Sequence, residues 1–88
     1  MTELNTLQGN RMTKEDELLL GLLGEREFLR RKVLEKNPDA TNIMFEGRDY
    51  GNLMMVSWQV PHEGLPGGRM AYLWPITRPQ DYDIPEIK

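Results

Sequence analysis

The hydrophobic period of this chain changes at Asn37-Pro38, and this change limits the folds that it can adopt. Before it, apolar residues recur at the three- and four-residue spacing of an amphipathic helix, at Leu18, Leu19, Leu22, Leu23, Leu29 and Val33. After it, apolar residues follow in short runs bounded by turn-forming residues, which is typical of antiparallel strands. The sequence therefore predicts an α+β fold in which one helix precedes a small sheet.

Both ends of the predicted helix carry the expected signals. Thr13 can cap the amino terminus, and three acidic residues in the next four positions favour the positive end of the helix dipole. Basic residues gather in the last turns, and Pro38 ends the helix because proline disfavours helical geometry in the residue before it. One helix of about 24 residues is the expected result.

Gly21 and Gly24 lie inside this predicted helix, where each costs about 1 kcal/mol relative to alanine. A close approach of helix to sheet, or a break between two short helices, would explain them. A hinge or a contact with a partner is the other explanation. The sequence favours the first explanation, since an interior glycine usually has a local backbone reason.

Three strands are predicted after the helix, over residues 42–47, 53–60 and 69–77, with a turn at 48–52 and a long loop at 61–68. The expected architecture is one amphipathic helix packed on a three-stranded antiparallel β-meander, in the order α-β-β-β. A chain of 88 residues has room for one core. We therefore expect a flexible N-terminal arm over 1–12, a single domain over 13–78 and an extended C-terminal tail over 79–88.

Both faces of the predicted sheet are apolar. In the second strand Met54, Val56, Trp58 and Val60 point to one side, which is the better candidate for the core. The third strand is apolar on both sides, and one helix can cover only one face. The other face is left to the C-terminal tail, to a second copy of the chain or to another protein.

Catalytic chemistry finds little support in the sequence. The chain has no cysteine, and its single histidine, His62, has no second histidine with which to bind a metal ion. Gly64, Gly67 and Gly68 lack the sequence of a phosphate-binding loop. We expect a non-enzymatic protein without a metal ion or other cofactor.

The formal net charge of −3 argues against nucleic acid as the partner. The alternative is a sheet on which Trp58, Tyr72 and Trp74 stack single-stranded bases, flanked by Arg48, Arg69 and Arg78. No apolar run is long enough to span a membrane, and the amino terminus lacks the pattern of a signal peptide, so a cytoplasmic protein is expected.

These observations favour a small protein–protein interaction module, such as an inhibitor or adaptor, that binds another protein through an apolar sheet face, the loop or the tail. A homodimeric structural protein is the further alternative. The residues expected to contact the partner are Met55, Tyr72 and Trp74 of the sheet, His62, Leu65 and Arg69 of the loop and its exit, and Tyr82 and Ile84 of the tail.

Overall fold

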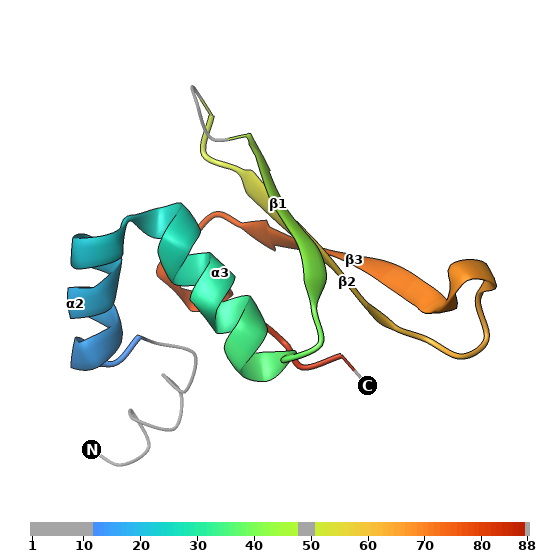
Figure 1. The fold of residues 1–88 in the computed structure, drawn as a ribbon. Helices are drawn as coiled ribbons and strands as arrows, with labels where there is room; N and C mark the ends of the chain where they lie inside the picture. The colour runs from blue at the N-terminus through green and yellow to red at the C-terminus, as the bar shows by residue number, and fades with distance from the viewer. Residues whose placement is uncertain (1–11, 48–50, 88) are drawn as a thin grey trace, which may run out of the picture.

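The computed structural model describes residues 12–47 and 51–87, and it confirms the α+β class and the antiparallel meander (Figure 1). Residues 1–11 of the expected N-terminal arm, and residues 48–50 of the expected turn, lie outside the described residues. The elements are α2 (Lys14–Leu23), α3 (Glu25–Lys36), β1 (Thr41–Gly47), β2 (Met54–Pro61) and β3 (Arg69–Ile76), with short 3-10 turns at Pro66–Gly68 and Pro79–Tyr82.

Between Lys14 and Lys36 the structure has two helices where the sequence pattern predicted one. Thr13 caps α2 as expected, because its Oγ1 accepts a hydrogen bond from the Asp16 N–H at 3.1 Å. Gly24 then interrupts the helical path with a φ of 86°, a conformation that side-chain-bearing residues rarely adopt. The break between two short helices is therefore the correct explanation for Gly24, and the expectation of one continuous helix is wrong.

Gly21 is a different case. A Cβ placed at this position would meet no atom within 4 Å, so no close approach of helix to sheet requires glycine there. Its φ is not positive either. The fold of the chain itself gives no packing reason for Gly21.

The strand pairings define two faces of the sheet. Val56 of β2 lies between Phe45 of β1 and Trp74 of β3, while its neighbour Ser57 lies between Met44 and Leu73 on the other face. A bulge in β1, where Asn42 has a φ of 57°, lets Thr41 and Met44 share one face.

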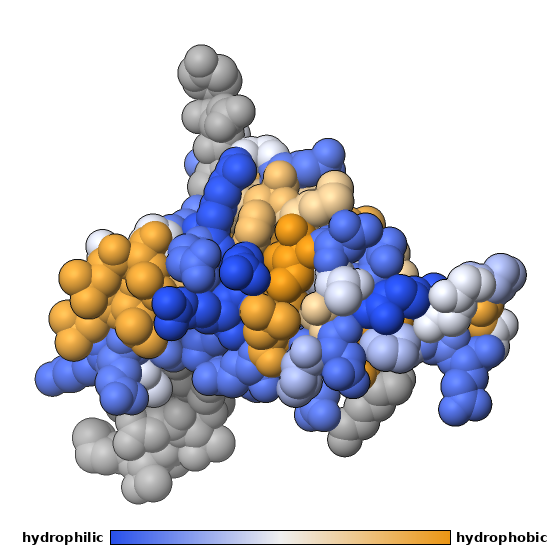
Figure 2. Space-filling view, viewed as in Figure 1, coloured by the Kyte–Doolittle hydropathy of each residue, from blue (hydrophilic) through white to orange (hydrophobic). Residues whose placement is uncertain are grey.

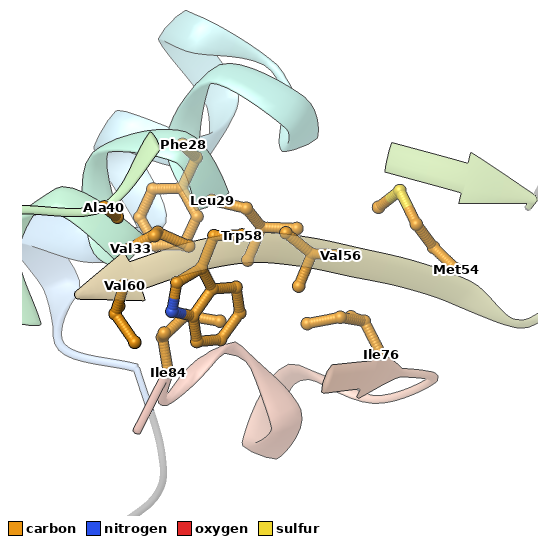
Figure 3. Close-up of a cluster of buried hydrophobic side chains, with 10 residues drawn as sticks. All are labelled: Phe28, Leu29, Val33, Ala40, Met54, Val56, Trp58, Val60, Ile76 and Ile84. Atoms are coloured by element: carbon orange, nitrogen blue, oxygen red, sulfur yellow. The ribbon is translucent and has the colours of Figure 1, made fainter. Parts of the chain in front are cut away.

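The hydrophobic core lies on only one face of the sheet. Figure 3 shows α3 lying over this face, with Trp58 of β2 at the centre of the buried cluster. The buried apolar residues are Phe28, Leu29, Val33, Ala40, Met54, Val56, Trp58, Val60, Ile76 and Ile84. This confirms the core face expected for β2. Ile84 belongs to the C-terminal tail, so the tail packs on the same side as the helices and not on the opposite face.

Buried Asn37 holds the tail in this position. Its side-chain amide donates to the Pro85 carbonyl at 3.0 Å, and its oxygen accepts from the Ile87 N–H at 2.8 Å. The residue is only 5% exposed, so these bonds form largely out of water. Asn37 thus ends α3 and fixes the path of the tail beneath it, as seen in Figure 1.

α2 packs against α3 and stands away from the sheet (Figure 1). Lys32 of α3 bonds to Asp16 of α2 with 3.1 Å between Nζ and Oδ1, and both side chains are largely buried. Burial lowers the pKa of Lys32, but the hydrogen bond and charge of Asp16, with a contribution from Glu35, raise it overall. No residue of α2 is fully buried, so this helix adds little to the core.

Substitution of the two helix glycines should change stability in opposite directions. Gly21→Ala should raise the free energy of unfolding by about 0.5 to 1 kcal/mol, because the helical backbone and the open space accept a methyl group. Gly24→Ala should lower it by about 1 kcal/mol or more, because its backbone conformation strains alanine. Urea denaturation followed by circular dichroism measures the free energy of unfolding of both variants. Equal changes in the two variants would contradict this account of the helix break.

Asn37→Ala should lower the free energy of unfolding by about 2 to 3 kcal/mol, because it leaves two backbone groups of the tail without their partner. Hydrogen exchange should also show faster exchange of the Ile87 N–H. Gln80→Ala is the control, since Gln80 is exposed and should change stability by less than about 0.5 kcal/mol. Unchanged exchange at Ile87 in Asn37→Ala would show that the tail is held by other contacts.

Candidate interaction surfaces

The face of the sheet opposite the core, called the open face here, is covered by no described element. Its side chains come from all three strands in cross-strand rows: Thr41, Gln59 and Ala71; Met44, Ser57 and Leu73; Glu46, Met55 and Pro75. Met44 is 51% exposed and Leu73 is 59% exposed, so its apolar centre is accessible. An accessible apolar centre on a sheet is typical of a binding surface.

A second apolar surface lies on the outer side of α2. Leu18, Leu19 and Leu22 are 67%, 40% and 80% exposed, and together they form the leucine ridge. Figure 2 shows this surface as a continuous hydrophobic area over α2. Leu18 and Leu22 are four residues apart and therefore stack on one side of the helix. The ridge and the open face belong to different elements and share no residue.

The structure places Tyr72 and Trp74 away from Met55. Both aromatic residues are half-buried on the core face, where Tyr72 packs on Trp58 with 5.6 Å between ring centroids. Trp74 donates from Nε1 to the Asp81 carbonyl at 2.6 Å. Met55 lies on the open face, so the three residues do not form one surface.

This arrangement also bears on the alternative of base stacking. Trp58 is fully buried, and among the described residues the open face carries no aromatic side chain. Arg78 forms an ion pair with Asp81, and Arg48 lies outside the described residues. The described part of the sheet therefore offers bases no stacking platform.

The loop between β2 and β3 is exposed along its length. His62 accepts a hydrogen bond at Nδ1 from the Gly64 N–H at 3.2 Å, and the His62 N–H donates to the Gly68 carbonyl at 2.7 Å. Leu65 is 39% exposed. These bonds give the loop a local turn structure, and they place no second titratable side chain against His62.

Arg69 joins the strands at the exit of this loop. Its Nη2 donates to the Gln59 carbonyl at 3.1 Å and to the carbonyl of Asp39, just before β1, at 3.0 Å. Because Arg69 pairs with Pro61, it belongs to the open face, where it lies at the end opposite Glu46. Arg69 thus gives one end of the open face a positive charge.

Of the two tail residues expected to contact a partner, Ile84 lies inside the fold and Tyr82 is half-buried. Ile84 is 1% exposed in the core. Tyr82 packs against Phe28 with 5.8 Å between ring centroids, and its hydroxyl donates to Glu25. The tail therefore serves the core of the domain, and Ile84 is not available at the surface.

The hydrophobic pattern did not reveal the leucine ridge, and it did not distinguish Met44 and Leu73 from the other apolar strand residues. It assigned Leu18 and Leu22 to the buried side of one long helix. A signal was present: five leucines between residues 18 and 23 cover more of a helix than one buried side requires. Once Gly24 breaks the helix, these leucines can no longer follow α3 onto the sheet.

The described residues contain neither a metal-ion cluster nor a membrane-spanning helix. Within residues 12–47 and 51–87, no group of three or more histidine or acidic side chains could hold a metal ion. No helix in the same ranges has the length and apolar character needed to cross a membrane. A comparison of the chain with protein-family models, curated proteins and solved structures finds no match.

Asp81 fixes the start of the tail through its carboxylate. Oδ2 accepts hydrogen bonds from the Thr77 N–H at 3.0 Å, the Thr77 hydroxyl at 3.0 Å and the Arg78 N–H at 3.2 Å. The backbone bond from Thr77 is the main cause that lowers the pKa of Asp81, and it outweighs the effect of burial. The charged carboxylate therefore stabilises the turn that supports Trp74.

This lowered pKa predicts a pH-dependent stability. The pKa of Asp81 is lower in the folded than in the unfolded chain. The contribution of its carboxylate to the free energy of unfolding is therefore complete above about pH 5 and is lost as the pH falls below about 4. The difference in unfolding free energy between the wild type and Asp81→Asn should shrink over that interval. Thermal or urea denaturation at several pH values measures this difference. A difference that stays constant with pH would contradict the stabilising role of the charged Asp81 carboxylate.

Proposed function

We propose that this chain is a small, non-enzymatic protein–protein interaction module that binds another protein through the leucine ridge of α2. The observation that carries the proposal is the exposure of Leu18 and Leu22, at 67% and 80%, on a helix that has no fully buried residue. Burying one such side chain contributes roughly 1.5 to 3 kcal/mol. Leucines held in water add little to the stability of the chain itself. Burying them against a partner would add directly to the affinity of the complex.

The spacing of the ridge supports a helix-in-groove mode of binding. Leu18, Leu19 and Leu22 occupy positions i, i+1 and i+4, which is the pattern of anchors that an amphipathic helix inserts into an apolar groove. Gly21 adjoins these leucines and has open space around it, so a partner could approach the helix backbone closely there. This would supply the reason for Gly21 that the fold itself does not.

Charge defines the expected partner more closely. Glu15, Asp16 and Glu17 lie in the first turn of α2, and its last turn has no basic residue. Asp16 pairs with Lys32, whereas exposed Glu15 and Glu17 have no ion pair within the described residues. The ridge therefore fits an apolar groove whose rim carries lysine or arginine near the start of α2.

An adaptor or inhibitor role agrees with these properties, since either requires one exposed docking element on a stable domain. The loop is a less favourable surface because Leu65 is its only large apolar side chain. The tail is less favourable because Ile84 is buried. The ridge thus has the most exposed apolar area for a partner.

Loss of the ridge should abolish binding to a partner. The protein is immobilised, incubated with an extract of the cells that produce it, and the retained proteins are quantified by mass spectrometry. Leu18→Glu and Leu22→Glu should each reduce retention of the specific partner about tenfold or more, because a buried carboxylate replaces an apolar anchor. Raised salt should weaken retention by the wild type as well.

Leu65→Glu is the matched control, since it makes the same chemical change at an exposed leucine of the loop. It should leave retention unchanged. Equal retention by all four proteins would contradict the proposal, and loss with Leu65→Glu alone would move the binding surface to the loop. Circular dichroism checks that each variant keeps the fold.

A further inference from the structure

The open face has a charge pattern that matches a second copy of itself. Its centre is apolar, with Met44, Met55 and Leu73. Glu46 lies on β1 at one end of the face, and the guanidinium of Arg69 lies at the other end, where it reaches from β3 across β2 to the Gln59 and Asp39 carbonyls. Glu46 is exposed and has no ion pair within the described residues. Each end therefore offers the charge that the other end of a second copy would attract.

We infer that the open face is an interface between two copies of this chain. In a two-fold interface the same patch is used twice, so that Glu46 of each copy meets Arg69 of the other. The two ends are six residues apart along β2, or about 20 Å on ideal strand dimensions. A two-fold axis in the plane of the interface, perpendicular to the strands, exchanges the two ends and also brings Leu73 close to Leu73 of the second copy.

The size of the face indicates a weak dimer. Three strands of seven or eight residues cover about 25 Å by 14 Å. Two such faces bury on the order of 1,000 Å² together, which is below the roughly 1,200 to 2,000 Å² of most stable interfaces. The chain should therefore exchange between monomer and dimer, with a dissociation constant in the micromolar range or above.

This dimer does not depend on the function proposed for α2, because the leucine ridge shares no residue with the open face. The two surfaces can therefore be tested by separate substitutions in the full chain. A change on the open face should alter self-association only, and a change on the ridge should alter binding of another protein only.

Light scattering during size exclusion, from the low micromolar range to about 1 mM, tests the inference. The measured mass of the wild type should rise towards twice the monomer mass as the concentration increases. Leu73→Glu and Met44→Glu should keep the monomer mass at all concentrations. Both residues are more than half exposed, so these variants should fold, which circular dichroism verifies. Glu46→Lys should weaken self-association roughly tenfold, and more at low salt than at high salt.

Leu22→Glu, on the ridge, is the matched control and should dimerise like the wild type. A wild type that keeps the monomer mass up to about 1 mM would overturn the inference. Dimers that persist in Leu73→Glu but are lost in Leu22→Glu would also overturn it, since α2 would then be the interface.

Discussion

The hydrogen bonds of buried Asn37 determine which side of the sheet the C-terminal tail can cover. The same side chain bonds to Pro85 and Ile87, so the tail must pass next to the end of α3. This path brings Ile84 into the core beside Trp58 (Figure 3). All apolar coverage is thereby placed on one face of the sheet. The tail therefore leaves the apolar centre of the other face accessible.

A second constraint acts at Gly24 and determines the position of α2. The positive φ of this residue redirects the chain, so α2 packs mainly on α3, where the bond between Asp16 and Lys32 holds it. In a continuous helix, Leu22 and Leu29 would lie seven residues apart on one side and both would face the sheet. The break instead leaves Leu22 in water. Two local features, a polar side chain and a glycine, thus create the two exposed apolar surfaces.

Much of the fold could be predicted from the sequence because its local signals agree with one another. The Thr13 cap, the stop at Pro38 and the alternation in β2 depend on neighbouring residues alone, and each was found as expected. The placement of Tyr72 and Trp74 depended on register, since β3 is apolar on both sides and only pairing with Trp58 and Val56 decides which side is covered. The position of Ile84 depends on the hydrogen bonds that Pro85 and Ile87 form with Asn37, 48 and 50 residues earlier in the chain, and no periodicity encodes such bonds.

The two exposed surfaces lie on different elements, and this separation has a consequence for binding. If two copies pair through their open faces, each dimer presents two leucine ridges, because α2 takes no part in the sheet. A partner with two suitable grooves would then be bound with an effective concentration set by the distance between the ridges, and its apparent affinity could exceed that of one ridge about 100-fold or more. Since the pairing is weak, this gain would appear only where the local concentration of the chain is high. Occupancy of the open face would in that way regulate how tightly the ridge holds its partner, without any change in the ridge itself.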